Sequence, residues 1–498
     1  MKLLIKNKFV SSFLGTIAVY LGIGFISCLN NFSVYITSYI NLKDSYVTMH
    51  YGLFIHLIYS FANTFSSSIG GFLENRIGFF KTIIIGFIII FFTNLAFIFQ
   101  QNIWLCYVLS LIFGIGTGIA SCLLGKNLAF YSPDKKGMLT GILGLGLMVV
   151  GAIFTFGGEK LINFDGKTLT EDEEFYPPEI AKRTTLYFFI GQFFIPVGLI
   201  LALLLLYEYK VEDNKKEKSN SENNLKEEEK VINQEEIQIE KNEENNNEKN
   251  EDKTKEKQEN ELKKEFSKKK IKQVVKSFRY WRLVITSFFV TIASSFIMNT
   301  GRTFGALIGI NGKALQFAAV IQTLAIIILM PILGMLADKK NPLTLIKIVS
   351  VVSIIPTFVL AFYMSNSLIF IVCLVIYSLN LVALAVSFGP FIMEVYGIQE
   401  SVILSGIIGG FTKISDIITT VSAFIFSLNC EGEDKECLKS RYAVMYIISG
   451  SCCVISSILL FFETKDKFQY EDIPVDDNNL INKGGVNKSL EMTTINEN

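Results

Sequence analysis

The apolar stretches of this 498-residue chain fall into two sets of six, separated by one long charged segment. A bilayer core about 30 Å thick requires roughly 20 mostly apolar residues per helix. Duplicated six-helix halves are typical of secondary transporters. The pattern therefore predicts an all-α integral membrane protein with twelve transmembrane helices in two pseudo-symmetric halves. The stretches lie at 10–37, 46–73, 80–99, 103–127, 137–159, 185–207, 281–309, 313–337, 343–364, 367–390, 401–428 and 441–463.

Charge is sharply segregated along the chain, and its distribution sets the domain boundaries. We expect a six-helix half at 1–207, a cytosolic linker at 208–280, a second six-helix half at 281–463 and a cytosolic tail at 464–498. The linker is dense in Glu, Lys and Asn and cannot bury enough apolar surface to offset its ordering entropy. Linker and tail are therefore predicted to be disordered. Because the 46 acidic and 46 basic residues cancel, net charge gives no reason to expect a nucleic-acid partner.

The basic residues also predict an orientation, because Lys and Arg are enriched in cytosolic loops. They occur at the N-terminus, in the linker and after the second, fourth and eighth stretches, whereas the connections near 100–102, 309–312 and 364–367 are poor in them. Both termini should therefore be cytosolic. We expect the plasma membrane, with an organellar membrane as the alternative.

Two cysteines bracket the polar loop CEGEDKEC between the last two stretches. With cytosolic termini this loop faces the outside or a lumen, where a disulfide can persist. Cys430 and Cys437 are therefore a candidate disulfide, although sequence alone does not prove pairing.

Two basic loops occupy corresponding positions in the two halves, GGFLENRIGFFKT after the second stretch and GMLADKKNP after the eighth. Glycine lets helices approach closely, and charges at helix ends can hold the halves together on the cytosolic side. Two such loops, six helices apart, predict a cytosolic gate, and the alternative is a pair of ordinary basic turns. The gate residues would be Gly71, Asn75, Arg76, Gly78, Lys81, Gly334, Asp338 and Lys339.

The first loop resembles the signature G-x-L-x-D-R-x-G-x-(x)-R/K of the major facilitator superfamily, with Asn75 at the position of the Asp. One charge of the gate is therefore missing, and Glu74 is a possible substitute. The segment YSPDKKGMLTGILGLG and the region 389–416 further resemble the oxalate:formate antiporter family and its monocarboxylate-transporter relatives. The resemblance implies the major facilitator fold, transport of small organic anions rather than enzymatic activity, and a substrate-binding Lys in the eleventh helix.

Lys413 is the Lys that matches this position, near the middle of the 401–428 stretch. An ionisable residue deep in a span is costly unless it faces a cavity or a partner. Lys413 could bind a substrate carboxylate, or it could form a structural pair with Asp416 on the same helical face. Asp416 could also carry a coupling proton. Arg302, in the outer third of the seventh stretch, could contact an anion, form part of an outer gate or extend to the membrane surface.

Polar residues of the first half are candidates for the rest of the site, namely Asn31, His56 and Asn63. His56 is a conceivable proton site, but a lone histidine in a span is more often a hydrogen-bond partner between helices.

Met330 stands where the resembled families place a second cation, so a monoanion balances Lys413 better than oxalate does. The sequence therefore predicts a secondary carrier for monocarboxylates such as lactate, pyruvate or formate, working by alternating access as a proton symporter or an anion exchanger. The alternatives are a carrier of an amino acid or other neutral solute, and a transport-inactive membrane receptor or scaffold. We expect a monomer in the lipid bilayer that needs no cofactor or metal.

Overall fold

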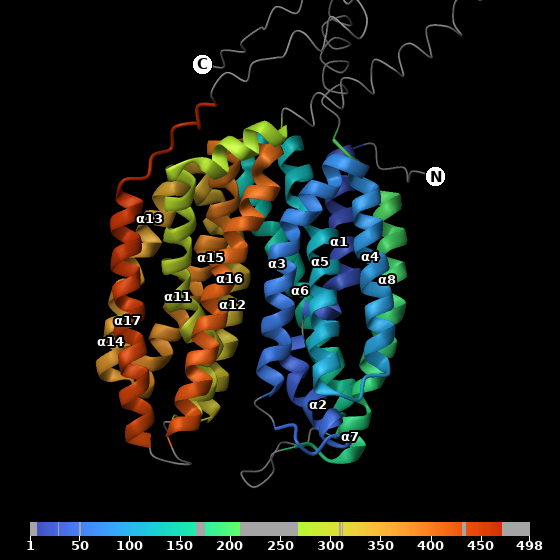
Figure 1. The fold of residues 1–498 in the computed structure, drawn as a ribbon, viewed down its shortest axis with the longest axis vertical. Coiled ribbons are helices and arrows are strands. Elements are labelled where there is room, and N and C mark those ends of the chain that lie inside the picture. The colour runs from blue at the N-terminus through green and yellow to red at the C-terminus, as the bar shows by residue number, and fades with distance from the viewer. Residues whose placement is uncertain are drawn as a thin grey trace, which may run out of the picture.

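The computed structural model describes residues 7–27, 29–48, 51–165, 175–209, 267–307, 310, 312–430 and 435–470, and these are almost entirely helical, with no strand among them. Two helical bundles stand side by side (Figure 1), one from each half of the chain. The predicted all-α architecture is confirmed. Each bundle has a core of its own. Apart from Val402, the core of the first bundle is built from residues before 207, and those of the second come from residues after 270.

The first half contains eight α-helices among its described residues. They are α1 (Lys8–Ser27), α2 (Leu29–Asn41), α3 (Gly52–Ile77), α4 (Phe79–Ile98), α5 (Ile103–Tyr131), α6 (Lys136–Ile162), α7 (Pro178–Lys182) and α8 (Thr184–Leu205). The short 3-10 helix η2 (Pro133–Lys135) precedes α6.

The second half contains α11 (Phe278–Leu307), α12 (Gly312–Lys340), α13 (Pro342–Val352), α14 (Ile354–Tyr363), α15 (Ser367–Tyr396), α16 (Ile398–Asn429) and α17 (Lys435–Phe461). The stretch predicted as one span at 343–364 is divided between α13 and α14 at Ser353. Pro356 explains the break, because proline lacks the amide hydrogen that would bond to the carbonyl four residues earlier. The first predicted span is covered by α1 and α2, and residue 28 between them lies outside the described residues.

Ten described helical segments are long and apolar enough to cross a membrane. α3 and α12 also match predicted spans in position but are not among the ten. α3 carries His56, Asn63 and three consecutive serines, which lower its mean hydropathy. Its polar character is relevant to the site described below.

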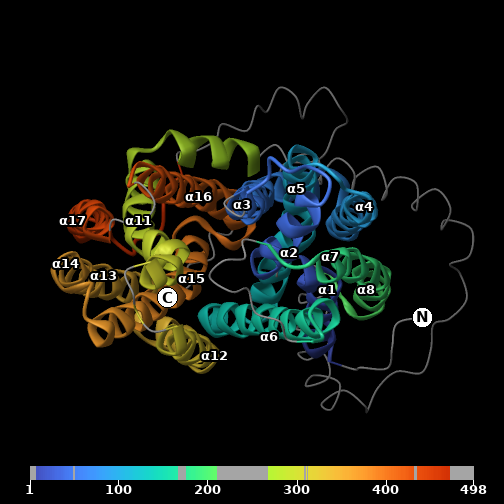
Figure 2. The ribbon, with the colours of Figure 1, turned by 90° about the horizontal axis from the view of Figure 1, so that it is seen from below.

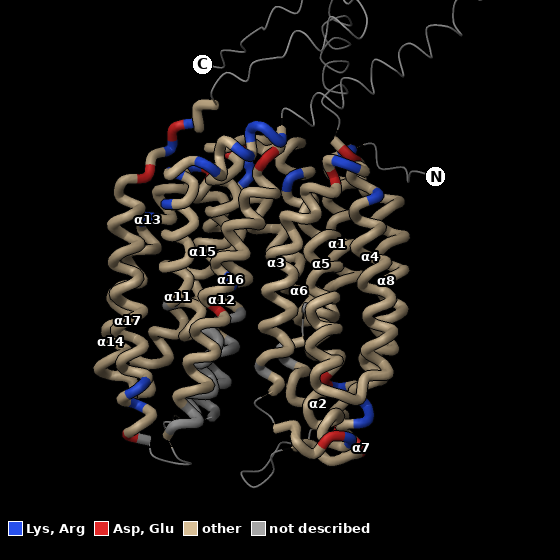
Figure 3. The backbone as a smooth tube through the Cα atoms, viewed as in Figure 1, with Lys and Arg blue, Asp and Glu red and all other residues tan. Residues whose placement is uncertain are grey.

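Charged residues gather at the two ends of the bundles, and the intervening backbone carries few of them (Figure 3). We call the end at which α1 begins and α17 ends the terminal end, and the other end, which carries α7, the opposite end (Figure 1). This distribution is the one a membrane requires, because a charge in the apolar core is costly unless it has a partner.

The linker prediction needs a correction at its boundary with the second half. Residues 267–276, which we placed in a disordered linker, form a helix, and α11 begins at Phe278 rather than after 280. Residues 464–470 of the predicted tail pack back on the second half, where the Phe468 amide donates to the Val395 carbonyl at 2.9 Å and the Tyr470 hydroxyl to the Tyr396 carbonyl at 2.7 Å. The rest of the linker and tail, 210–266 and 471–498, lies outside the described residues.

Candidate functional site

Lys413 and Asp416 form an ion pair near the middle of α16. Lys413 Nζ lies 2.7 Å from Asp416 Oδ2, and the two side chains are 31% and 13% exposed. Ser295 of α11 donates a hydrogen bond to the other oxygen, Asp416 Oδ1. A second contact joins the same two helices, with 3.0 Å between the hydroxyl oxygens of Thr291 and Ser415. Asp416 is thus held on both oxygens, while its Lys413 partner remains partly accessible.

The Lys413 face of α16 is the face that packs on α3. Gly406 lies so close to α3 that an added Cβ would come within 2.6 Å of the Ser68 amide nitrogen, and Gly409 lies against Thr64. Lys413 follows Gly409 by four residues and therefore shares its side of the helix. Figure 2 shows α3 of the first half beside α16 of the second. Lys413 is thus placed at the boundary between the halves.

An aromatic contact closes the same boundary on the other side of Lys413. The rings of Phe54 on α3 and Phe424 on α16 meet edge to face, with their centroids 5.7 Å apart. Lys413 therefore lies between the glycine contacts toward the terminal end and this phenylalanine pair toward the opposite end.

His56 of α3 interacts electrostatically with this pair, because the charges of Lys413 and Asp416 both act on it. Its Nδ1 is buried and has no hydrogen-bond partner among the described residues. A buried polar atom without a partner costs about 1–3 kcal/mol. Such an atom beside an ion pair is a place where a ligand or water can complete the hydrogen bonding.

The structure describes the side chain of only one of the other predicted site residues. Asn63 Oδ1, also on α3, is buried without a hydrogen-bond partner among the described residues, but no contact with Lys413 or Asp416 is seen. The side chains of Asn31, on α2, and Arg302, on α11, lie outside the described residues, so their roles stay predictions. Ser295, Thr291 and Ser415 were not predicted. The signal that could have identified Ser295 is the serine pair in the otherwise apolar run VTIASSFIM.

The predicted gate loop of the second half joins the two halves through Asp338. Its carboxylate accepts hydrogen bonds from the amides of Gly137, at 2.6 Å, and Met138, at 2.8 Å, in the first turn of α6. An added Cβ on Gly137 would lie 2.5 Å from the Gly334 carbonyl oxygen, so the two backbones are in close contact. We call this contact the α6–α12 seam.

The predicted gate loop of the first half lies at a second junction, which we call the α3–α16 seam. Gly71 packs against Ile403, whose carbonyl also accepts a hydrogen bond from Ser68 at 3.1 Å. Glu74 pairs with Lys126 of α5 at 2.7 Å, and so its charge is used within the first half. Asn75 is half-buried, and Gly78 has the positive φ of 92° that joins α3 to α4. The remaining predicted gate residues are exposed, namely Arg76, Lys81 and Lys339.

Met330 occupies a packing position, which accounts for the absence of a cation there. It is buried, and it lies against Gly141 and Gly144 of α6 in the α6–α12 seam. A charged guanidinium at this position would meet helix backbone and lose its solvation.

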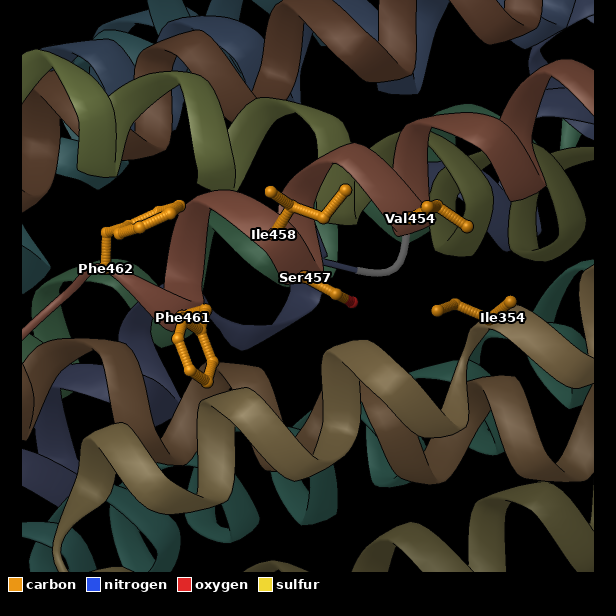
Figure 4. Close-up of a pocket in the computed structure, with 6 residues that line it drawn as sticks. All are labelled: Ile354, Val454, Ser457, Ile458, Phe461 and Phe462. Atoms are coloured by element: carbon orange, nitrogen blue, oxygen red, sulfur yellow. The ribbon is translucent and has the colours of Figure 1, made fainter.

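A groove on the outer side of the second half is chemically different from the ion-pair site. It is lined by Ile354 of α14 and by residues of α17 and its end (Figure 4), namely Val454, Ser457, Ile458, Phe461 and Phe462. The Ser457 hydroxyl is already paired with that of Ser350 at 2.9 Å. An apolar groove of this kind suits lipid chains rather than a small charged solute.

The predicted disulfide is present. Cys430 and Cys437 are bonded, with 5.9 Å between their Cα atoms, between α16 and α17 at the opposite end. This end is the one that we predicted to face away from the cytosol.

Two helical halves that meet along a boundary with polar groups are an arrangement typical of multi-pass membrane transporters. The family model described as Major Facilitator Superfamily matches residues 9–420. The chain belongs to this superfamily.

Solved structures support the same fold. The proton:xylose symporter XylE, bound to 6-bromo-6-deoxy-D-glucose, is 12% identical with a TM-score of 0.63, covering 91% of this chain and 95% of XylE. A single-substitution variant of the E. coli fucose:proton symporter FucP is 12% identical with a TM-score of 0.54, covering 90% of this chain and 99% of FucP. FucP in the outward conformation has 11% identity and a TM-score of 0.56, with the same coverage. No curated protein matches the chain.

Proposed function

We propose that this transporter carries small organic monoanions with a carboxylate group, such as lactate, pyruvate or formate, and that Lys413 binds the carboxylate. The observation that carries the proposal is a partly accessible ammonium in the middle of a membrane helix, at the boundary between the halves. Substrates of superfamily carriers bind near the midplane between halves that rock around them. A carboxylate there gains a charge-assisted hydrogen bond from Lys413.

The charge balance of the site favours a monoanion. Asp416 neutralises Lys413 when the site is empty, at a separation of 2.7 Å. When Asp416 is protonated, a substrate with one carboxylate can replace it as the partner of Lys413 without leaving excess charge in the membrane. A dianion would need a second cation, and Met330 takes the position at which the resembled families carry one.

Proton coupling follows from the same pair. A proton on Asp416 would remove the internal competitor and free Lys413 for the substrate, so proton and anion would bind together and cross as symport. His56, on which the charges of this pair act, is the alternative proton acceptor. Exchange of one anion for another is the second mode, in which the site alternates between substrates without becoming empty.

Orientation and gating complete the proposal. The terminal end would face the cytosol in the plasma membrane, where the closed seams separate Lys413 from the cytosol. Opening the α6–α12 and α3–α16 seams while the Phe54–Phe424 contact is kept would expose Lys413 to the cytosol, and opening that contact while the seams are kept would expose it to the other side. This exchange of open ends is alternating access.

Uptake by proteoliposomes tests the proposal. Lactate, pyruvate, formate, oxalate and amino acids would be compared between the parent protein and Lys413→Ala. We expect monocarboxylate uptake by the parent and its loss in Lys413→Ala. The matched control is Lys439→Ala, which breaks another ion pair of i,i+3 spacing, with Glu436 at the opposite end, and should transport normally. Undiminished monocarboxylate uptake by Lys413→Ala would show that the assigned role is wrong.

One observation favours a second candidate, a carrier of neutral solutes. Asp416 is satisfied on both oxygens by Lys413 and Ser295, as in a structural ion pair. Exchanging the charges (Lys413→Asp with Asp416→Lys) should then preserve transport, whereas it abolishes carboxylate uptake under the first proposal.

A further inference from the structure

The helix formed by residues 267–276, which we call the connector helix, lies flat at the terminal end (Figure 1). It runs along the outer edge of the bundles beside α16, and it is seen from the side in the view that shows the spanning helices end-on (Figure 2). Its flat position follows from the turn into α11, where the Ser277 hydroxyl donates to the Val274 carbonyl at 2.7 Å and the Trp281 indole to the Val275 carbonyl at 2.7 Å. The helix therefore occupies the level at which a bilayer's headgroups meet the protein.

One face of the connector helix is fixed to the second half. Ile271 and Val274 are buried in the core that includes Tyr280 and Leu404. Lys270 lies over the Tyr470 ring, 4.8 Å from its centroid. These contacts hold the helix in one rotation about its axis.

The other face carries a row of lysines. Lys268, Lys272 and Lys276 are all exposed. Their spacing of four residues places them on one side of the helix, away from the buried Ile271 and Val274. A helix with an apolar face, a row of cations and a position at the membrane surface has the properties of an interfacial helix.

We propose that the connector helix is an anionic-lipid contact, in which Lys268, Lys272 and Lys276 bind the headgroups of acidic phospholipids in the leaflet at the terminal end. Charge complementarity carries the choice of partner, because each lysine near a membrane surface adds about 1 kcal/mol of attraction to acidic lipids. The rigid docking of the opposite face keeps the lysines in place before the lipid binds, so little ordering entropy is lost on binding. The proposal is independent of the transported substrate.

Trp281, at the junction of the connector helix with α11, provides a reporter. The chain has two tryptophans, and Trp104 lies in the first turn of α5, at the opposite end. Trp104→Phe would leave Trp281 as the only donor for energy transfer to dansyl-labelled lipids in proteoliposomes. We expect stronger transfer to dansyl-phosphatidylserine than to dansyl-phosphatidylcholine, and a decrease in this preference at high salt.

Substitutions of the lysines complete the test. Changing Lys268, Lys272 and Lys276 to Gln should lower the preference by roughly fivefold per lysine, whereas changing the same three to Arg should keep it. The matched control changes three exposed lysines of the opposite end, Lys43, Lys160 and Lys182, to Gln and should keep the preference.

Three results would overturn the proposal. The first is equal transfer to both lipids in the parent, and the second is a preference that survives the Gln substitutions. The third is a preference that appears only after residues 211–262 are deleted, which would mean that in the full chain this Glu-rich segment, rather than lipid, occupies the lysines.

Discussion

The α6–α12 and α3–α16 seams are corresponding contacts between the two halves. They differ in which residue places a negative charge at the N-terminus of the helix, α6 in one seam and α16 in the other. α6 has no acidic residue in its first turn and receives Asp338 from the other half. α16 has an acid of its own, the buried Glu400, and faces a loop in which Asn75 replaces the signature Asp. A helix N-terminus favours a nearby negative charge. In one seam this charge joins the halves, and in the other it lies within a single helix.

The difference indicates a division of roles between the seams. The α6–α12 seam is held by two charge-assisted hydrogen bonds, whereas the α3–α16 seam has a neutral hydrogen bond and glycine packing. The weaker seam is the one beside Lys413. We therefore expect substrate binding to act first on the α3–α16 seam, with the α6–α12 seam setting how firmly the terminal end is closed.

Removing Asp338 should have the largest effect on this comparison. Asp338→Ala removes both hydrogen bonds to α6 and should weaken closure by about 3 kcal/mol, or roughly 100-fold in the closed-to-open equilibrium. Distances between spin labels at the exposed positions of Lys81 and Lys340, one on each half, would report the opening. Asp134→Asn, an exposed acid shortly before α6, is the control. An unchanged distance distribution in Asp338→Ala would remove the basis for ranking the seams.

Crowding the same seam should have the next largest effect. A Cβ on Gly141 would lie 2.5 Å from the Met330 carbonyl oxygen, so Gly141→Ala should cost about 1–3 kcal/mol of closure. The control lies in the same helix. Gly157 has nothing within 4 Å of an added Cβ, and Gly157→Ala should stabilise α6 by up to about 1 kcal/mol. Thermal unfolding and the spin-label distance should separate the two variants, and equal effects would refute the close approach.

A smaller loss is expected in the α3–α16 seam. Ser68→Ala removes the hydrogen bond to the Ile403 carbonyl and should cost about 1 kcal/mol. Ser67→Ala is the control, because the Ser67 hydroxyl bonds within its own helix to the Asn63 carbonyl. If Ser68→Ala opens the terminal end as much as Asp338→Ala does, the two seams are equivalent after all.

The smallest effect is expected from restoring the signature residue. Asn75→Asp should change closure by less than about 1 kcal/mol, because Glu400 already places a negative charge in the first turn of α16. The double variant Asn75→Asp with Glu400→Gln should close more firmly than Glu400→Gln alone, as measured by the same labels. Equal closure in these two variants would mean that Asn75 does not act on the α16 N-terminus.

Much of the fold could be predicted from the sequence, because a bilayer imposes one length and one composition on every span. The paired loops also drew attention to Asp338, which joins the two halves in the structure. They could not identify its partner, since Gly137 lies 201 residues earlier and only tertiary packing brings the two together. The helix at 267–276 was missed because its lysines continue the charged composition of the linker, although Ile271 and Val274 have helical spacing.

The site was predicted in part for a similar reason. Lys413 and Asp416 stand out as charges within one apolar stretch, and their three-residue spacing predicts the pair. Ser295 belongs to another helix, and a serine in a span gives no strong signal by itself. The position of Met330 in a packed seam likewise depends on how close α6 comes to α12, which is a property of the assembled halves.

The most direct test of the account is carboxylate binding to the purified protein and two variants, measured as a thermal shift with formate, lactate or pyruvate. If Lys413 is the substrate ligand and Asp416 its internal competitor, Lys413→Gln should abolish the shift. Asp416→Asn should enlarge it, because an added carboxylate then takes the place of the missing one. A shift that persists in Lys413→Gln, or that disappears in Asp416→Asn while that variant remains folded, would contradict the account.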